Sequence, residues 1–394
     1  MSEAAGSLKP LNASNLEVTW TTSPKAVPAH GSQQQPEVTT DHMITVSWTH
    51  DGGWETPKLV PYGPLSFLPS SSVLNYASTC FDGFKLYRGY DGRLRMLQPE
   101  YNCRRMLQSA VRITLPEFDP QELLKLIREL CIVEAPKWLP TDMAGTSLYI
   151  RPVMMGCDTT LGYRPARSAL LCIFLVYWPG PKVVAPVLAD AGTPVSEQGS
   201  RLLASTEREA RAFPGGSGAA KIGANYAPTL LPHAKAVKKG YDQVLWLFGP
   251  NRYVTEAGGS NFFIIWKTDA GGLELVTAPL DDDGLILAGS TRAFVLSLAR
   301  TMFKHEQDDG TGPCEVVERR FTMEEVEAAA DEGRLESVFV TGTAWQIHPV
   351  GVIGSKGRDI KIPVGKLPHM SLLREKMLSI VYGEEEDGWV QVVE

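Results

Sequence analysis

The chain has 394 residues, more than one hydrophobic core usually organises, so we expect two domains. Hydrophobic residues make up 43% of it and charged residues 21%, which is typical of globular proteins. The formal net charge of −7 at pH 7 argues against a nucleic-acid-binding or anionic-membrane-binding surface, because such surfaces need clustered lysine and arginine. A small anionic substrate is compatible with this charge, since a local basic pocket does not depend on it.

No membrane span, disulfide framework or leader peptide is predicted. The longest apolar run, residues 169–178, has about half of the ~20 residues that a transmembrane helix needs. The six cysteines are scattered, with no CxxC spacing and no nearby histidine, which predicts neither a metal site nor structural disulfides. The first arginine is Arg88, whereas organelle leaders are rich in arginine, so we expect a cytosolic protein and leave a mitochondrial location open.

The first part of the chain predicts an arm and a small domain. Residues 1–40 are rich in Ala, Ser, Pro, Gln and Thr without periodicity, which indicates an extended N-terminal arm. A small N-terminal domain is expected over 41–179. It begins with a strand over 42–48 and a hairpin over 84–97, in which "GYDG" is typical of a turn.

Two helices are predicted after this hairpin. The first covers 99–112, where apolar residues recur on one stripe. The second begins at Pro120, with Asp119 as its N-cap and Glu122 closing a pair that resembles a capping box. Two further strands complete the domain, over 146–155 and 169–178.

The composition changes after residue 179. Residues 180–200 are rich in Pro, Gly and Ala, which predicts an interdomain connection, and 201–394 are expected to form a larger second domain. Its first helix is predicted to begin after Thr229, as the cap, and to run to Gly240. The next predicted elements are a hairpin over 243–267 around "GPNR" and a strand over 273–280. Within 287–299 a small polar loop opens an amphipathic helix, and 322–333 is a second helix, with a Thr322–Glu325 capping box. A strand over 337–350 ends in a tight turn. We find no internal repeat. The predicted strands and helices indicate an α+β fold with mixed sheets in two domains.

A single lysine, Lys221, lies in the small-residue stretch "GAAKIGANYAPT". In isolation a loop lysine is most often a solvated surface residue. A lysine amine can instead form a Schiff base with a carbonyl if desolvation or cationic neighbours keep it neutral. Pyridoxal phosphate is the best-known protein-bound carbonyl, and it also needs a phosphate site and an acidic partner for its ring nitrogen.

Candidates for both of these parts are present. Ser290 and Thr291 in "LAGSTR" offer hydroxyls and backbone N–H groups at a predicted helix start, where the helix dipole favours an anion. Thr343 in "VTGT" lies in a second small-residue turn. Glu256 in "VTEAGGSNFF" lies in a predicted strand, where a carboxylate needs a cationic partner or exposure to water. Each feature alone also fits a structural role, as a helix cap or a solvated carboxylate.

Together these stretches resemble the branched-chain amino acid aminotransferases of the eukaryotic type, which are class IV aminotransferases with the type IV fold of pyridoxal-phosphate enzymes. "CFDGFKLYRG" is similar to the family's F-E-G-x-K-A-[FY], and "NCRRMLQSAVR" is similar to its N-x-x-R-M-x-x-S-A-x-R. "TSLYIRPVMMG", "KIGANYAPT", "GYDQVLWLFGP", "TEAGGSNFF" and "GLILAGSTR" continue the match in order, from about residue 42 to the C-terminus. The resemblance implies a smaller N-terminal α/β domain and a larger C-terminal domain with mixed sheets in a pseudo-barrel.

The resemblance also implies pyridoxal 5'-phosphate as the cofactor and the residues that contact it. Lys221 would be the Schiff-base lysine and then the base that moves a proton between the substrate α-carbon and the cofactor. Tyr226 would hydrogen-bond the phenolic oxygen, and Glu256 would face the pyridine nitrogen. The phosphate would be held by Arg105, Ser290, Thr291 and Thr343.

The substrate pocket of the family maps to a second set of positions. They are Tyr76, Phe81, Tyr149, Arg151, Tyr163, Gly259, Gly342 and Ala344. An aromatic-lined cavity with few polar groups suits an aliphatic side chain. The N–H groups of Thr343 and Ala344 would receive the α-carboxylate. Arg151 would order the second carboxylate of glutamate or 2-oxoglutarate, or serve as a structural ion-pair partner.

Several positions depart from the family pattern. Gly259 replaces a usual threonine, Tyr163 stands where a smaller aliphatic residue is common, and Ala288 replaces a proline. Trp345 and His348 stand where a C-x-x-C pair or small residues occur, which excludes redox switching through such a pair. These departures bear on which side chain fits, and not on the cofactor chemistry.

The predicted function is therefore transamination. The amino group of L-leucine, isoleucine or valine passes to 2-oxoglutarate in a ping-pong cycle, giving the branched 2-oxo acid and L-glutamate. The alternatives are a paralogue for another hydrophobic or specialised amino acid, a lyase or epimerase on the same fold, and a catalytically inactive binding protein. Family members are usually dimers, so we expect a homodimer with small-molecule substrates, and neither nucleic acid nor membrane as a partner.

Overall fold

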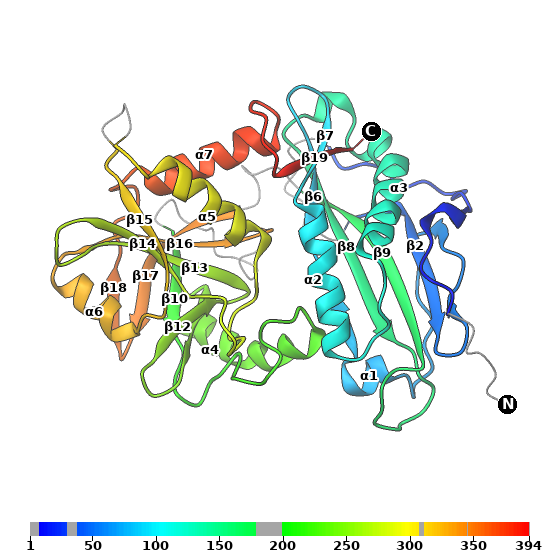
Figure 1. The fold of residues 1–394 in the computed structure, drawn as a ribbon, viewed down its shortest axis with the longest axis horizontal. Helices are drawn as coiled ribbons and strands as arrows, with labels where there is room; N and C mark the ends of the chain where they lie inside the picture. The colour runs from blue at the N-terminus through cyan, green and yellow to red at the C-terminus, as the bar shows by residue number, and fades with distance from the viewer. Residues whose placement is uncertain (1–7, 30–37, 179–198, 307–310, 345, 394) are drawn as a thin grey trace. The chain divides into compact units, whose positions relative to one another are not determined.

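The computed structural model describes residues 8–29, 38–178, 199–306, 311–344 and 346–393, and the predicted connection over 180–200 lies almost entirely outside these ranges. The chain divides into two compact units (Figure 1). Of the described residues, unit 1 holds those up to 178 together with 220–224 and 381–393. Unit 2 holds 199–219 and 225–380.

Two stretches that the sequence places in the second domain belong to unit 1. Residues 220–224 join it because Ile222 forms a β-bridge with Cys80 and is buried in the core of unit 1. Residues 381–393 join it because strand β19 (Val390–Val393) pairs antiparallel with β7 (Leu94–Leu97). Both are long-range pairings, which the local pattern of the sequence does not report.

Unit 1 is built on a ten-stranded mixed sheet. The order along its main path is β1 (Glu17–Val18), β4 (Lys58–Pro61), β2 (Thr39–Thr49), β9 (Ser168–Trp178), β8 (Ser147–Gly156), β6 (Phe84–Arg88), β7 and β19. Two short strands lie off this path, β3 (Gly53–Trp54) on β2 and β5 (Thr79–Phe81) on β8. The predicted hairpin around "GYDG" is confirmed by the antiparallel pairing of β6 with β7.

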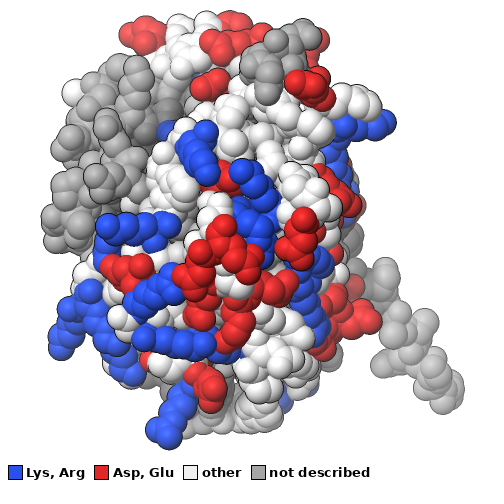
Figure 2. Space-filling model, turned by 90° about the vertical axis from the view of Figure 1, so that its left-hand side faces the viewer, with Lys and Arg blue, Asp and Glu red and all other residues white. Residues whose placement is uncertain are grey.

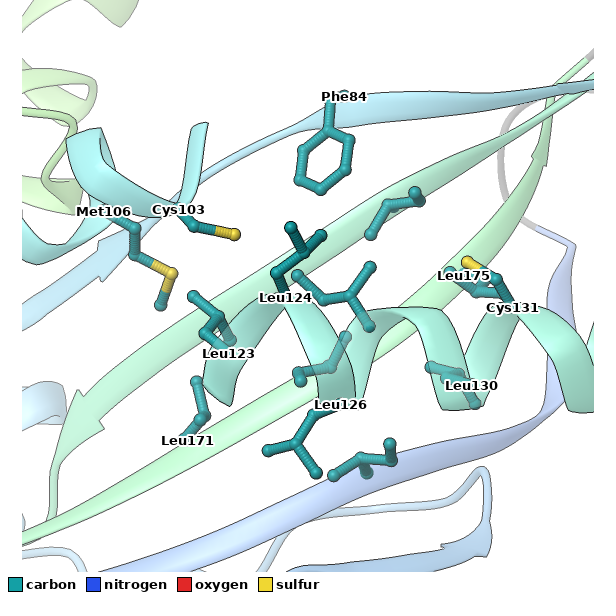
Figure 3. Close-up of a cluster of buried hydrophobic side chains, with 14 of the residues drawn as sticks. Phe84, Cys103, Met106, Leu123, Leu124, Leu126, Leu130, Cys131, Leu171 and Leu175 are labelled. Atoms are coloured by element: carbon teal, nitrogen blue, oxygen red, sulfur yellow. The ribbon is translucent and has the colours of Figure 1, made fainter. Parts of the chain in front are cut away.

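Helices α2 (Pro99–Arg112) and α3 (Pro120–Trp138) pack on this sheet, and α1 (Ser72–Tyr76) precedes β5. Figure 3 shows leucines of α3 beside Cys103 and Met106 of α2, Phe84 of β6 and Leu171 of β9. Burying each of these large apolar side chains contributes roughly 1.5–3 kcal/mol. Cys103, Met106 and Ala110 of the predicted stripe of α2 are buried in this core, whereas Val111 at its end is exposed.

The described part of the N-terminal arm packs on unit 1 and is not a solvated extension. Leu11 and Ala13 are buried in the core, around a short 3₁₀ turn, Ala13–Asn15. The N–H of Ala13 donates to Glu122 Oε2 at 2.7 Å. The predicted Asp119 cap is confirmed, since its carboxylate accepts the N–H of Gln121, but the capping-box role of Glu122 is wrong because this contact engages Glu122 instead.

Unit 2 is built on a nine-stranded mixed sheet. Its path runs β12 (Tyr253–Ala257), β11 (Gln243–Phe248), β10 (Ser200–Ala204), β17 (Gln346–Ser355), β16 (Leu335–Gly342), β13 (Ser260–Lys267), β14 (Leu273–Thr277) and β15 (Cys314–Glu318), with β18 (Arg358–Lys361) on β17. Because β12 also pairs with β13, six of these strands close into a barrel-like ring. The predicted turn at "GPNR" is confirmed by the pairing of β11 with β12, but the second half of the predicted hairpin is two antiparallel strands, β12 and β13. The stretch 337–350 is a hairpin of β16 and β17, and not one strand.

Four helices accompany this sheet: α4 (Leu230–Lys238), α5 (Ser290–Met302), α6 (Met323–Asp331) and α7 (His369–Val381). The capping box of α6 is confirmed, with both Thr322 and Glu325 bonded as predicted. The side-chain cap at α4 is wrong, because the Thr229 hydroxyl donates to the carbonyl of Tyr226 at 2.6 Å.

The face of the molecule in Figure 2 carries acidic and basic side chains intermingled. Exposed ion pairs of unit 2 include Arg358–Asp331 and Lys356–Glu324. Such pairs contribute little to stability, about 0–1 kcal/mol each, but they keep the local charge balanced. Among the described residues, no helix combines the length and apolarity needed to cross a membrane.

Candidate active site

Lys221 is fixed in unit 1 through its backbone. Its N–H donates to Ser109 Oγ on α2 at 2.8 Å, and its carbonyl accepts the N–H of Phe81 at 3.1 Å. Ser109 Oγ in turn donates to the carbonyl of Arg105, one turn earlier on the helix. The small-residue loop is thus fastened to α2 and to the end of β5, so the start of the lysine side chain is held in place.

The amine of Lys221 lies in an environment that disfavours its charge. Removal from bulk water lowers the pKa of Lys221 to about 8, and the positive charge of Arg105 acts in the same direction. Nζ lies 5.0 Å from the centroid of the Phe81 ring. At pH 7.5 roughly a quarter of such an amine is neutral, against about one part in a thousand for an ordinary lysine. Lys221 therefore has a nucleophilic amine at neutral pH.

Arg105 is buried and held by an acid that the sequence analysis did not assign. Its Nε donates to Asp82 Oδ2 at 2.9 Å and its Nη2 donates to Oδ1 at 2.7 Å. Asp82 has no exposed surface. Asp82 belongs to the quoted stretch "CFDGFKLYRG", so the motif contained the signal, but only the fold shows which cation it meets.

Three of the predicted substrate residues lie together in unit 1. The Arg151 guanidinium stacks 4.8 Å from the Phe81 ring centroid and 5.2 Å from that of Tyr149, and its Nη2 donates to the Tyr149 hydroxyl at 3.3 Å. Arg151 forms no ion pair with a described residue, and its Nε is buried without a hydrogen-bond partner among them. The structural ion-pair explanation for Arg151 is therefore wrong within the described chain.

Tyr76 and Tyr163 meet each other on the surface of unit 1. Their rings make an edge contact with centroids 6.3 Å apart, and the Tyr76 hydroxyl donates to the carbonyl of Leu161 at 2.6 Å. The Tyr163 side chain is 95% exposed and that of Tyr76 is 43% exposed. Both side chains are therefore exposed in the single chain.

Glu256 is buried on β12 of unit 2 and held on one side by neutral donors. It lies opposite Asn261 of β13, whose Nδ2 donates to Oε1 at 3.2 Å. The same Oε1 accepts the N–H of Leu287 at 3.1 Å, and Asn261 Nδ2 also donates to the carbonyl of Leu287. The loop that leads to α5 is thus tied to the glutamate.

Arg211 is the cationic partner that the sequence leaves unnamed. Its Nη1 lies 2.7 Å from Glu256 Oε2, and both side chains are buried. Arg211 also donates to the carbonyls of Gly218 and Leu285 at 3.4 and 3.3 Å. It lies in an irregular loop, where neither periodicity nor the quoted motifs indicate a role. The ion pair supplies the cationic partner that a buried carboxylate needs.

Ser290 and Thr291 are buried at the first two positions of α5. The N-cap is Gly289, and no side chain caps this end. A Cβ at residue 289 would lie 2.1 Å from Asn261 Oδ1, so only glycine fits there. The start of a helix with small hydroxyl residues suits a phosphate, because its N–H groups and dipole favour an anion.

The other predicted residues of unit 2 lie in turns. Gly342 ends β16 and pairs with Gln346, so Thr343 and Ala344 are in the tight turn between β16 and β17. Gly259 lies in the β12–β13 hairpin, where a Cβ would meet nothing within 4 Å. Tyr226 lies just before the 3₁₀ turn Ala227–Thr229.

Trp345 and His348 stand where the family has a C-x-x-C pair or small residues. Trp345 lies outside the described residues. His348 Nε2 lies 2.9 Å from Ser200 Oγ, and burial lowers the pKa of His348 to about 4. A neutral, hydrogen-bonded histidine therefore occupies one of these positions.

The structure thus groups the predicted residues in two clusters. The lysine cluster of unit 1 contains Phe81, Arg105, Tyr149, Arg151 and Lys221, with Asp82 and Ser109 as additions. The glutamate cluster of unit 2 contains Glu256, with Asn261, Leu287 and Arg211 as additions. Ser109 could have been found from its spacing, since it follows Arg105 by four residues on one helix face.

Comparisons with known proteins show similarity to aminotransferases. The family model for amino-transferase class IV matches residues 79–353. The cytosolic branched-chain-amino-acid aminotransferase of Saccharomyces cerevisiae is 39% identical over 401 residues, covering 98% of this chain and 98% of that protein. The mitochondrial branched-chain-amino-acid aminotransferase of Schizosaccharomyces pombe is 38% identical over 384 residues, covering 96% of this chain and 85% of that protein.

Solved structures show the same fold. The T.th. branched-chain amino acid aminotransferase with pyridoxamine 5'-phosphate has a TM-score of 0.64 at 26% identity, covering 89% of this chain and 98% of that one. The Escherichia coli branched-chain amino acid aminotransferase has a TM-score of 0.63 at 23% identity, with 89% and 99% covered. The family match and the relatives confirm the predicted two-domain type IV fold and identify this chain as a member of the class IV aminotransferases.

Proposed function

We propose that this protein is a transaminase for branched-chain L-amino acids, which passes the amino group of leucine, isoleucine or valine to 2-oxoglutarate with pyridoxal 5'-phosphate as cofactor. The observation that carries the proposal is the amine of Lys221, anchored to Ser109 and Phe81 and with its pKa lowered to about 8. Relatives that span nearly the whole chain are named for this activity.

The residues present fit the cofactor. The buried Arg105, the N-terminus of α5 with Ser290 and Thr291, and the turn at Thr343 offer donors for its phosphate. Glu256, paired with Arg211, would face the ring nitrogen, and Tyr226 would hydrogen-bond the phenolic oxygen. When bound, the cofactor supplies an electron sink for the carbanion at the substrate α-carbon.

Lys221 is the residue that transfers the proton at the substrate α-carbon. With the cofactor bound, Lys221 is the residue that would hold it covalently through Nζ. Released by the substrate amine, Nζ would be the base that takes up and returns the proton of the substrate α-carbon. An amine with a pKa of about 8 suits both directions, because it is neither fully protonated nor fully neutral near pH 7.5.

The substrate contacts are proposed on the same basis. The stacked side chains of Phe81 and Tyr149 offer apolar surface for an aliphatic side chain. Arg151, whose Nε has no partner among the described residues, binds the second carboxylate of glutamate or 2-oxoglutarate. The N–H groups of Thr343 and Ala344 receive the α-carboxylate. Gly259 and Gly342 leave room for it.

The quaternary state that we propose is a homodimer. Tyr76, Leu161 and Tyr163 form an exposed apolar group on unit 1, with Tyr163 almost fully exposed. A second copy covers this group and uses Tyr76 and Tyr163 as part of its own substrate pocket. Sedimentation equilibrium should give twice the chain mass, and a Tyr163→Ala variant should raise KM for leucine.

The compartment that we propose is the cytosol. The S. cerevisiae relative, which aligns with 98% of this chain, is named cytosolic. The S. pombe relative is named mitochondrial. A fluorescent fusion of the full chain should be distributed in the cytosol, and coincidence with a mitochondrial marker would contradict this assignment.

A panel of amino donors tests the function. The purified protein is incubated with 2-oxoglutarate and each of leucine, isoleucine, valine and a set of aromatic and polar amino acids, and glutamate is measured. We expect the three branched donors to rank highest. A different donor at the top would favour the paralogue with shifted specificity, which the departures at Gly259 and Tyr163 leave room for. Product formation without any 2-oxo acid, or inversion at the α-carbon, would favour a lyase or an epimerase.

A further inference from the structure

Asp82 has an unusually complete set of donors for a residue without an assigned role. It lies in the loop between β5 and β6 and has no exposed surface. Its Oδ1 accepts the N–H of Gly83 at 2.7 Å, Asn102 Nδ2 at 2.8 Å and Arg105 Nη2 at 2.7 Å. Its Oδ2 accepts Arg105 Nε at 2.9 Å.

These contacts determine the orientation of Arg105. A fully buried carboxylate is costly unless it is paired and hydrogen-bonded, and here both conditions are met. The two-point contact fixes the plane of the guanidinium, which a single bond would leave free to turn. Asn102 and Arg105 are three residues apart on α2, so both reach Asp82 from the same face of that helix.

The same turn of α2 reaches Lys221. Ser109 follows Arg105 by four residues, donates to the Arg105 carbonyl and accepts the N–H of Lys221. The orientation of Arg105 is therefore coupled to the helix that anchors the lysine. The charges of Arg105 and Asp82 act on the Lys221 amine in opposite directions, the first lowering its pKa and the second raising it.

We propose that Asp82 is a positioning residue for the cofactor phosphate, which holds one edge of the Arg105 guanidinium so that the remaining N–H groups face the phosphate in a fixed plane. This rests on the proposed function, since it assumes that the cofactor binds at Lys221 and Arg105. Asp82 touches neither substrate nor cofactor. Its effect passes through Arg105 and is therefore specific to the phosphate.

Pyridoxal, which lacks the phosphate, separates this role from a merely structural one. Cofactor-free protein is titrated with pyridoxal 5'-phosphate and with pyridoxal at pH 8, and the ratio of the two dissociation constants is compared among wild type, Asp82→Asn, Arg105→Met and the double variant. Asp41→Asn is the matched control, because Asp41 is also a buried acid of unit 1, paired with Lys137 at 2.6 Å.

We expect D82N to reduce the preference for the phosphorylated ligand about 10–100-fold, the range of a lost charge-assisted hydrogen bond or two. R105M should reduce it by as much or more, the double variant by no more than R105M, and D41N should leave it unchanged. Equal weakening of both ligands by D82N, or an unchanged ratio, would overturn the proposal.

Two further outcomes keep the test decisive. If D82N does not fold, the charge-retaining D82E is used, and the proposal requires its ratio to stay within about threefold of wild type. A D82E ratio as low as that of R105M would overturn it. If wild type binds neither ligand, the proposed function fails, which is distinct from a failure of the role of Asp82.

Discussion

At the scale of residues, two buried ion pairs hold side chains that we propose as contacts of the cofactor. Asp82 holds Arg105 in unit 1, and Arg211 holds Glu256 in unit 2. Buried pairs contribute little net stability, because desolvation offsets the attraction. These pairs instead fix the position and orientation of each charged group. Lys221 is the opposite case, a cation held where its charge is disfavoured.

Replacing Lys221 should therefore stabilise the cofactor-free protein in a pH-dependent way. The pKa of Lys221 is about 8 in the folded chain and ordinary, near 10.5, in the unfolded chain. Below pH 8 the buried charged amine lowers the free energy of unfolding by its full amount. Between about pH 8 and 10.5 the unfolded chain binds one more proton than the folded chain, so the free energy of unfolding rises with pH and the loss disappears. Lys221→Met should raise the free energy of unfolding by about 1–2 kcal/mol at pH 7, a figure discounted for partial exposure of the side chain. This increase should shrink by pH 10.

Urea unfolding of the cofactor-free proteins at pH 7, 8.5 and 10 measures this difference. Lys58→Met, at an exposed position on β4, serves as the control and should show no such trend. A K221M gain that stays constant with pH would contradict a depressed pKa.

Replacing Arg211 should lower the free energy of unfolding, because Glu256 is then buried without its cationic partner. Arg211→Met leaves a buried carboxylate without its cation, which should destabilise the cofactor-free protein by about 3–5 kcal/mol. The double variant R211M/E256Q should recover part of this loss, because no charge is then left unpaired. Urea unfolding of both single variants and the double variant gives the coupling energy, and simple additivity would show that the pair does not act as a unit.

At the scale of elements, the sequence predicts what is local and periodic. The bounds of α2 and the caps at Asp119 and Thr322 follow from spacing along the chain, and the structure confirms them. The contacts of Glu122 and Thr229 could not be predicted, because distant or competing partners take them. The same holds for Asp82 and Arg211, whose partners are set by the pairing of strands and loops.

Gly289 shows how one element depends on such a contact. Its missing side chain lets Asn261 Oδ1 approach the start of α5, where a Cβ would come within 2.1 Å. Gly289→Ala should push Asn261 away from Glu256 and Leu287 and cost about 2 kcal/mol or more. The control Gly259→Ala, where a Cβ meets nothing within 4 Å, should change stability by less than about 0.5 kcal/mol. Equal unfolding midpoints for the two variants would contradict this reading.

At the scale of the whole molecule, the family resemblance predicted the two-domain type IV fold and the class of reaction, both of which the comparisons confirm. The sequence could not predict that 220–224 and 381–393 belong to unit 1, since their pairing partners lie far away in the chain. The contacts of the cofactor and substrate residues stay proposals, and the exposure of Tyr163 links one of them to the assembly of two chains.

Thiol reagents should not inactivate the native enzyme. Five of the six cysteines are buried and Cys157 is half-buried. Burial raises the pKa of every one of these thiols, to about 11 for Cys157 and to about 12 for Cys80, Cys172 and Cys314. Because the thiolate is the reactive form, iodoacetamide at pH 7.5 should leave activity unchanged. All six thiols should react after unfolding in urea, and rapid loss of native activity would reveal an accessible thiolate.

Transfer of a labelled amino group tests the central claim most directly. The enzyme with added pyridoxal 5'-phosphate is incubated with ¹⁵N-leucine and unlabelled 2-oxoglutarate, and the isotope is followed by mass spectrometry, with Lys221→Ala in parallel. We predict that ¹⁵N appears in glutamate and not in free ammonia, and that K221A lowers the rate at least about a thousandfold. Label released as ammonia, no labelled glutamate from any branched donor, or a K221A rate close to wild type would contradict the account.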